Sequence, residues 1–200
     1  MTETPRERRR EKNKNAILDI ATELIHSNGI ENISLREIAK HADYSPAGLY
    51  KYFDSKAAII QAVQVRENQK LIELLQTVSS DLSPTQRLIE LSLLYIQYSL
   101  DNSVYLVLIN SLSSGRKTKE QAVPATSPYV LFLNAVDVWG QHEGIKFQQD
   151  YGLEEITYTL WSLIHGMATL RVSQLRDFEA DFQSINRRSI ELFISGLQQL

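Results

Sequence analysis

Apolar residues recur at helical spacing along almost the whole chain. The stripe nearest the N-terminus consists of Ile17, Leu18, Ala21, Leu24 and Ile25. Spacings of i, i+1, i+4, i+7 and i+8 put these side chains on one face of an amphipathic helix. Asn28-Gly29 follows, and this pair favours the left-handed backbone conformation that ends a helix. The pattern therefore predicts a helix over about 15–28.

The same periodicity continues to the C-terminus, and no segment shows the sustained alternation of a strand. Ser83-Pro84 is typical of a helix start, with serine as the N-cap and proline at the first position. Residues 114–128 hold turn formers and no apolar stripe, so we expect a long surface loop there. Further helices are predicted at 55–78, 84–101, 103–113, 127–143, 152–174 and 178–198. The sequence thus predicts an all-α fold of about nine helices.

Residues 34–53 contain two helix-start signals with a turn between them. Ser34 and Glu37 form an S-x-x-E capping box. Asp43 stands where the chain must turn sharply, and aspartate tolerates left-handed backbone angles better than most residues. Ser45 and Pro46 then repeat the N-cap and first-position signals. This order of helix, tight turn and helix indicates a DNA-binding helix-turn-helix.

The second of these helices, expected at about 46–52, buries Leu49 and Phe53 by its pattern. The side chains expected to point outward are Ala47, Gly48, Tyr50, Lys51 and Tyr52. Small residues allow close approach to base edges, and tyrosine hydroxyls and a lysine can reach bases or phosphates. Lys56, at the start of the next helix, adds a positive charge. The alternative is a pair of short helices that pack within an ordinary α-helical domain.

Charge is unevenly distributed around a net charge of −3. The N-terminal segment concentrates basic residues at Arg6, Arg8, Arg9, Arg10, Lys12 and Lys14. A basic arm on an acidic protein suggests a polyanion partner, because cations near phosphates release condensed counterions. The alternative is a solvated, disordered tail. The charged N-terminus is not a secretory signal, and no run reaches the ~18 apolar residues of a membrane span, so we expect a cytoplasmic protein without membrane contact.

Residues 15–60 resemble the N-terminal domain of the TetR family of bacterial regulators. The matching segments are Ala16-Ile17-Leu18 to Ala21-x-x-Leu24, Asn28-Gly29-Ile30, Ser34-Leu35-Arg36-Glu37-Ile38-Ala39 and Ser45-Pro46-Ala47-Gly48-Leu49-Tyr50-Lys51-Tyr52-Phe53-Asp54-Ser55-Lys56. Asp43 replaces the glycine that is usual in the turn, and Ala57 replaces a common acidic residue. Neither departure removes an expected DNA contact.

The resemblance implies a homodimer with a three-helix DNA-binding domain, residues 1–56, and a ligand-binding and dimerisation domain, residues 57–200. By that resemblance the DNA contacts are Ser34, Arg36, Ser45, Ala47, Gly48, Tyr50, Lys51, Tyr52 and Lys56. It further implies that the last two helices of each subunit form the dimer. A bound effector would tilt the fourth helix, change the spacing of the recognition helices and release a palindromic operator.

Aromatic residues concentrate in the C-terminal part and are candidates to line an effector pocket. These candidates are Tyr95, Tyr98, Tyr105, Trp139, Tyr158 and Trp161, with His165 beside them. The alternative for each is an ordinary core position. Trp161 and His165 are four residues apart and share a helix face. With Gly166 they resemble a Trp/His-Gly signature of one TetR subgroup. A lone histidine in an apolar helix is more often a core or interface residue than a ligand contact, so that role is the alternative for His165.

An enzyme is disfavoured by what the sequence lacks. The chain has no cysteine, which excludes disulfides and thiolate catalysis, and it shows no phosphate-binding glycine loop or nucleophile elbow. Its histidines lack metal-ligand spacing, so neither metal nor cofactor is predicted. We expect a sequence-specific regulator with a double-stranded DNA operator and a small-molecule effector as partners. The alternative is a helical interaction protein or an architectural DNA-binding protein.

Overall fold

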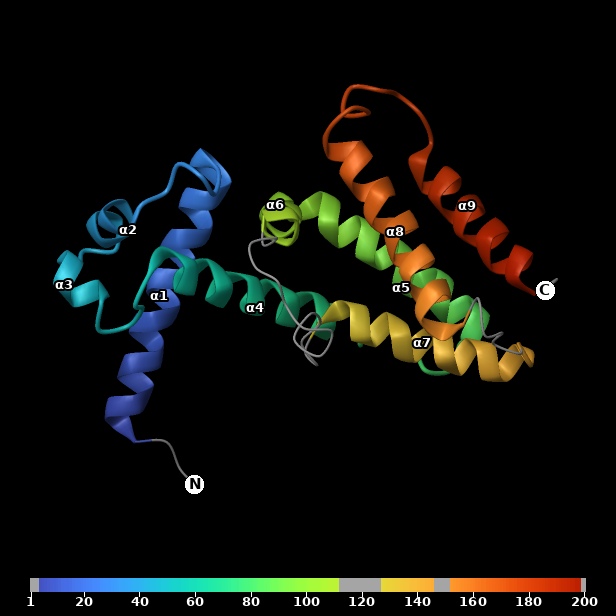
Figure 1. The fold of residues 1–200 in the computed structure, drawn as a ribbon, viewed down its shortest axis with the longest axis horizontal. Helices are drawn as coiled ribbons and strands as arrows, with labels where there is room; N and C mark the ends of the chain where they lie inside the picture. The colour runs from blue at the N-terminus through green and yellow to red at the C-terminus, as the bar shows by residue number, and fades with distance from the viewer. Residues whose placement is uncertain (1–3, 112–126, 146–151, 199–200) are drawn as a thin grey trace. The chain divides into compact units, whose positions relative to one another are not determined.

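The computed structural model describes residues 4–111, 127–145 and 152–198, and every regular element in these ranges is a helix. The helices are α1 (Pro5–Asn28), α2 (Leu35–His41), α3 (Pro46–Leu49), α4 (Lys56–Leu75), α5 (Pro84–Asp101), α6 (Ser103–Ser111), α7 (Pro128–Glu143), α8 (Leu153–Val172) and α9 (Phe182–Leu197) (Figure 1). The predicted all-α class is therefore confirmed. The loop predicted at 114–128 lies almost entirely outside the described residues.

The described residues divide into two compact units. The first holds the chain up to Glu67 together with α6, and the second holds residues 68–102 with α7, α8 and α9. α4 therefore contributes to both units. The sequence assigned 57–200 to a single domain, whereas in space α6 packs with the N-terminal helices.

The N-terminal unit is built around the apolar stripe of α1. Ile17 and Ala21 are fully buried, and they share their core with Ile38 of α2, Leu49 of α3 and Ile59 of α4. α6 adds Val104 and Leu108 to this core. α1 and α2 pack together, as do α2 and α3. Tight burial on several sides holds the short α2 and α3, which have too few residues to be stable alone.

α1 begins at Pro5, well before the predicted start near residue 15. A capping box starts it, because Thr4 Oγ1 accepts from the Glu7 amide at 3.3 Å and the Glu7 carboxylate accepts from the Thr4 amide at 2.7 Å. These hydrogen bonds lower the pKa of Glu7, since they favour the charged carboxylate. The basic N-terminal segment is therefore helical from residue 5, and its interpretation as a disordered tail is wrong.

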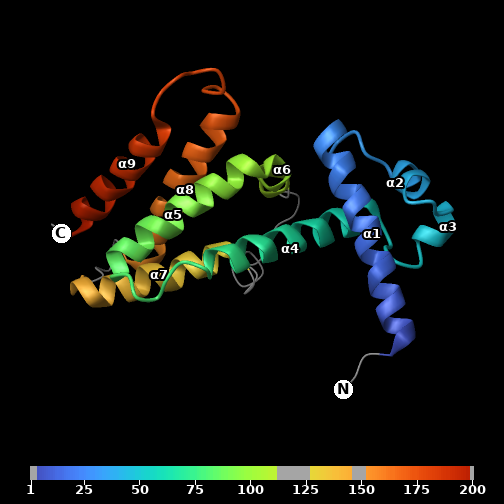
Figure 2. The same cartoon turned by 180° about the vertical axis from the view of Figure 1, so that it is seen from behind.

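α5 is the centre of the C-terminal unit and packs against α7, α8 and α9 (Figures 1 and 2). It begins at the predicted Ser83 cap, where Ser83 Oγ accepts from the Gln86 amide at 3.2 Å. Two serines are fully buried in it, and each hydroxyl donates to the carbonyl four residues earlier: Ser92 to Leu88 at 2.7 Å and Ser99 to Tyr95 at 2.8 Å. Their polar atoms are thus satisfied inside the unit. No helix in the described ranges is long and apolar enough to cross a membrane.

Candidate functional site

Residues 34–53 fold as two short helices joined by a tight turn, as predicted. Ser34 is the N-cap of α2, and its Oγ accepts from the Glu37 amide at 3.2 Å. Asp43 has a φ of 57° and is the one non-glycine residue with a positive φ in the described chain. Ser45 is the N-cap of α3, with its Oγ 3.0 Å from the Gly48 amide. The turn chemistry of the sequence therefore fixes the path between the helices.

The second half of the predicted capping box does not form. The Glu37 carboxylate accepts instead from Asn28 Nδ2 at 3.1 Å. This contact ties the start of α2 to the end of α1, so that Glu37 positions one helix against another. The predicted contact of Glu37 within the capping box is therefore replaced by a contact with a neighbouring helix.

α3 is shorter than predicted, because it ends at Leu49 and residues 50–52 form a turn. Leu49 and Phe53 are buried, and Ala47, Tyr50 and Lys51 are exposed, as expected; Tyr50 is 54 % exposed. The exposed side chains are not needed by the core beneath them. They are therefore free to contact another molecule.

Gly48 is half-buried instead of pointing freely outward. A Cβ at this position would stand 3.2 Å from Ser45 Oγ and 3.4 Å from Tyr44 Cδ1. The absence of a side chain keeps the cap and the Tyr44 ring close to the helix. Gly48 thus shapes the surface of α3.

Tyr52 is also half-buried, so its prediction as a free outward side chain is wrong. Its ring packs edge-to-face on Tyr44, with centroids 5.6 Å apart, and its hydroxyl accepts from Asn13 Nδ2 at 2.9 Å. That hydrogen bond lowers the pKa of Tyr52, because it stabilises the phenolate. One helical turn earlier, Arg10 Nη2 donates to the Lys51 carbonyl at 3.3 Å. The part of α1 that precedes the predicted start near residue 15 therefore packs on the turn after α3.

Asn13 is a functional candidate that the sequence analysis missed, and Arg10 was predicted only as one charge of the basic segment and not as a contact of the turn after α3. Both lie in the basic segment, where no apolar stripe announces a packed face. A contact made 39 residues away along the chain, such as Asn13 to Tyr52, leaves no periodic signal. Only the folded unit brings the two segments together.

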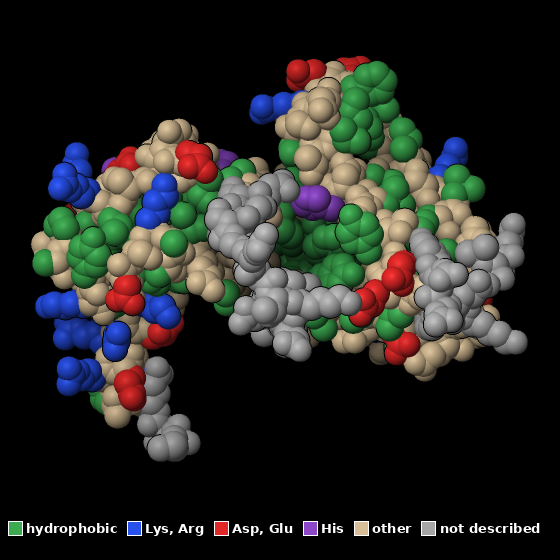
Figure 3. Space-filling model, in the orientation of Figure 1, with side chains coloured by type: hydrophobic (Ala, Val, Ile, Leu, Met, Phe, Trp, Pro, Cys, Tyr) green, Lys and Arg blue, Asp and Glu red, His purple; other side chains and the backbone are tan. Residues whose placement is uncertain are grey.

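Basic side chains gather around α1 and α3 on the face shown in Figure 3. The exposed ones on the extended part of α1 are Arg6, Arg8, Arg9, Arg10 and Lys12. Lys14 is half-buried and lies over the Phe53 ring, 5.9 Å from its centroid. Of the remaining predicted contacts, Ser34, Arg36 and Ser45 are exposed, and Lys56 Nζ donates to the Glu31 carbonyl at 3.2 Å.

The C-terminal unit brings together three of the predicted effector residues. The Tyr95 and Trp161 rings lie 4.8 Å apart, and the Tyr95 hydroxyl is hydrogen-bonded to His165 Nδ1 at 2.9 Å. Burial lowers the pKa of His165, because the imidazolium is poorly solvated there. Two α7 residues that the sequence analysis did not single out complete the group: Phe132 and Tyr129, at 5.6 Å and 5.7 Å from Trp161. We call these five residues the aromatic cluster.

The other aromatic candidates lie elsewhere. Trp139 of α7 and Tyr98 of α5 are buried. Tyr105 belongs to α6 and therefore to the N-terminal unit. Tyr158 is 67 % exposed on α8. Phe132 and Tyr129 are three residues apart on one helix, so their shared face was a signal available in the sequence.

Comparison with known proteins identifies a family that shares the N-terminal helices of this chain. Residues 17–63 match the family "Bacterial regulatory proteins, tetR family". The chain is similar to the uncharacterised HTH-type transcriptional regulator YobS of Bacillus subtilis, with 22 % identity over 185 residues and 90 % of both chains covered. The fold is similar to that of a bacterial regulatory protein in the tetR family from Rhodococcus RHA1, with a TM-score of 0.68 and 20 % identity over 92 % of this chain and 96 % of the other.

A protein of unknown function from Rhodococcus sp. RHA1 has a similar fold at a TM-score of 0.78, with 21 % identity and coverage of 93 % of this chain and 95 % of the other. The matched residues 17–63 contain α2, the tight turn and α3. Residues 17–63 therefore form a helix-turn-helix DNA-binding segment of the kind that defines the TetR family of bacterial regulatory proteins, and the fold of the chain is similar to that of a solved protein of this family.

Proposed function

We propose that this transcription regulator is a homodimeric repressor that binds a palindromic operator and releases it when a small molecule binds the C-terminal unit. The observation that carries the proposal is the exposed surface of α2, α3 and the turn that follows. Ala47, Tyr50 and Lys51 are exposed there, while Leu49 and Phe53 anchor the same segment in the core. A rigid backbone with free polar and small side chains is what major-groove readout requires.

The proposed DNA contacts are those given by the family resemblance, divided by task. Ala47, Gly48 and Tyr50 face base edges, while Lys51 and Lys56 approach phosphates. In the structure the Lys56 ammonium donates to the Glu31 carbonyl. It must therefore break this hydrogen bond before it can contact a phosphate. The backbone contacts set the register, and the base contacts supply the sequence preference.

The basic side chains of α1 extend the proposed interface. Asn13 and Arg10 tie this helix to Tyr52 and Lys51, so its charges are held in a fixed relation to α3. Each cation brought near a phosphate releases condensed counterions and steepens the salt dependence of binding. A regulator that binds the chromosome in this way acts in the cytoplasm of a bacterium.

The aromatic cluster is the proposed effector site. Its rings supply an apolar lining, and the Tyr95–His165 pair supplies a polar group that can orient a ligand. A ligand that binds one conformation of this unit better than another shifts the population toward it. Operator affinity then falls by the difference in binding free energy between the two states.

The proposed dimer interface is formed by α8 and α9. α9 turns one face inward, through Ile190, Ile194 and Leu197, and leaves Ile185 and Leu192 47 % and 74 % exposed. A second apolar face on a helix that already has a packed face indicates a partner. A two-fold dimer would bury the same face from both subunits.

Selection of binding sites from random double-stranded DNA tests this function. We expect a palindrome with half-sites about one helical turn, ~34–36 Å, apart, since two recognition helices of a two-fold dimer must reach the same side of the duplex. A compound screen against the bound complex then tests release. If the selected sequences share no common motif, an architectural DNA-binding protein is favoured. If no compound releases the protein from DNA, the small-molecule effector is no longer part of the proposal.

A further inference from the structure

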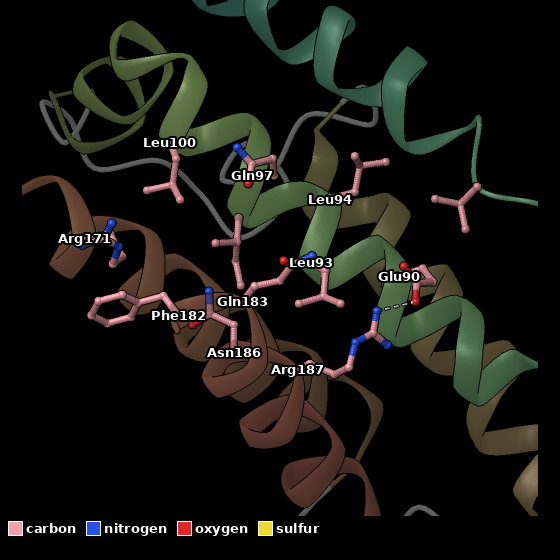
Figure 4. Close-up of a pocket in the computed structure, with 12 residues that line it drawn as sticks. Glu90, Leu93, Leu94, Gln97, Leu100, Arg171, Phe182, Gln183, Asn186 and Arg187 are labelled. Carbon is pink, nitrogen blue, oxygen red and sulfur yellow. Dashed lines mark hydrogen bonds and ion pairs between the residues drawn. The ribbon is translucent and has the colours of Figure 1, made fainter. Parts of the chain in front are cut away.

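A groove lies between α5 and α9 in the C-terminal unit (Figure 4). Its volume is about 480 Å³, within the range of ~300–1,000 Å³ that is usual for small-molecule sites. Leu93, Leu100 and Phe182 supply apolar surface, and Arg171, Asn186 and Arg187 supply polar groups. No residue of the aromatic cluster lines it, so the groove is a separate feature of this unit.

Arg171 at one end of the groove has an unused hydrogen-bonding edge. Its Nη1 donates to the Leu175 carbonyl at 2.7 Å, and its guanidinium lies over the Phe182 ring at 4.1 Å from the centroid. Its Nε is buried and has no hydrogen-bond partner among the described residues. Nε and Nη2 form the side-on fork that binds a carboxylate with two parallel hydrogen bonds. The stacking on Phe182 holds the plane of this fork.

Asn186 is a second polar group that lines the groove. It is only 7 % exposed, and the described part of the structure gives its amide no hydrogen bond. It extends from α9 between Phe182 and Leu93 (Figure 4), which places an unused donor and acceptor in the groove wall.

The two ends of the groove differ in charge. Glu90 Oε1 and Arg187 Nη2 form an ion pair at 2.9 Å, and Figure 4 shows this pair at the opposite end from Arg171. The one carboxylate in the lining is therefore paired and lies away from the free guanidinium edge. The groove thus offers an anion-binding end, an apolar middle and a neutralised far end.

We propose that this groove is a second ligand site, which takes a small amphipathic carboxylate. The carboxylate binds the Nε–Nη2 edge of Arg171. The apolar body lies along Phe182, Leu100 and Leu93, and Asn186 hydrogen-bonds a polar atom of the ligand. The site is independent of the aromatic cluster and of the proposed operator contacts.

Isothermal titration of the full chain with octanoate, and with 1-octanol as the neutral analogue, tests the charge requirement. Octanoate is expected to bind saturably with at least about tenfold higher affinity than octanol, because only the carboxylate pairs with Arg171. Equal affinities, or no saturable binding of octanoate, would overturn the proposal. This comparison uses the unaltered protein and does not depend on the folding of a variant.

Variants locate the site. Arg171→Met keeps the stem and the contact with Phe182 but removes the fork, and it should weaken octanoate binding about tenfold or more; Arg171→Lys, which keeps the charge alone, should recover only part of this loss. His165→Gln in the aromatic cluster is the matched control and should leave octanoate affinity unchanged. Circular dichroism melting checks that each variant folds. If octanoate affinity falls in the His165 variant and stays unchanged in the Arg171 variant, octanoate binds at the aromatic cluster and the proposal is overturned.

Discussion

Lys51 carries a charge that the fold does not use. Its side chain is exposed, and its hydrogen bonds are made by its backbone, from its amide to the Gly48 carbonyl and from Arg10 to its own carbonyl. Lys51→Ala should therefore leave thermal stability unchanged and weaken operator binding. The magnitude of the slope of log K against log salt should fall by about one per protomer, because one phosphate contact is lost from each. Fluorescence anisotropy at several salt concentrations measures both quantities.

Arg176→Ala serves as the control for Lys51. It also removes an exposed positive charge, but from the C-terminal unit. Its effect on operator binding should be small. Equal losses in the two variants would mean that net charge, and not the α3 surface, governs the affinity.

His165 is the residue whose protonation the fold opposes. Burial lowers its pKa in the folded chain, while the unfolded chain keeps the ordinary value of about 6.5. The neutral imidazole therefore adds stability that is complete above about pH 6.5 and is lost as the pH falls through the folded pKa. The melting temperature of the wild type should fall more between pH 8 and pH 5.5 than that of His165→Gln. Parallel pH profiles for the two proteins would contradict this role.

At the scale of elements, the shorter of two hydrogen bonds between the N-terminal part of α1 and the turn after α3 is the one that joins two side chains. Asn13 Nδ2 donates to the Tyr52 hydroxyl at 2.9 Å, and both groups are partly buried. Tyr52→Phe and Asn13→Ala should each cost about 1 kcal/mol of unfolding free energy, and the double variant should cost less than the sum. Urea denaturation of the wild type, the two single variants and the double variant measures the coupling free energy between Asn13 and Tyr52. Additive losses would show that the contact does not hold the two segments together.

The elements show where sequence reasoning succeeds and where it stops. Ser34, Asp43 and Ser45 were predictable, because caps and positive φ angles depend on a few neighbouring residues. The N-terminal extension of α1 was missed, since its residues are polar and no apolar stripe marks them as helical. α9 begins at Phe182 and not near 178, because Asp181 caps it through the Ser184 amide at 3.1 Å.

The packing of the candidate sites was only partly predictable. Trp161 and His165 share a helix face by their spacing, and the structure brings Tyr95 to them. The inclusion of Phe132, the exposure of Tyr158 and the assignment of Tyr105 to the other unit depend on which helices pack together. Chain spacing alone does not determine those neighbours.

At the scale of the whole molecule, Leu192 tests the proposed dimer. This leucine is 74 % exposed on α9, and a charge at that position would be buried without a partner in a subunit interface. Leu192→Glu should shift the protein from dimer to monomer in sedimentation velocity at micromolar concentration. Val138→Glu on α7, an apolar residue that is 56 % exposed, is the matched control and should remain dimeric. A dimeric Leu192→Glu protein would move the interface away from this face.

The central claim is that the exposed α2–α3 surface reads a DNA sequence. The most direct measurement compares the affinity of the full chain for its selected operator with that for a scrambled duplex of the same length and composition, at one physiological salt concentration. We predict that operator affinity exceeds scrambled-duplex affinity by ~10³ or more, because phosphate contacts form on any duplex and base contacts form only on the correct sequence. This ratio should fall sharply when Tyr50 is replaced by alanine. A ratio near one, unchanged in Tyr50→Ala, would contradict the account.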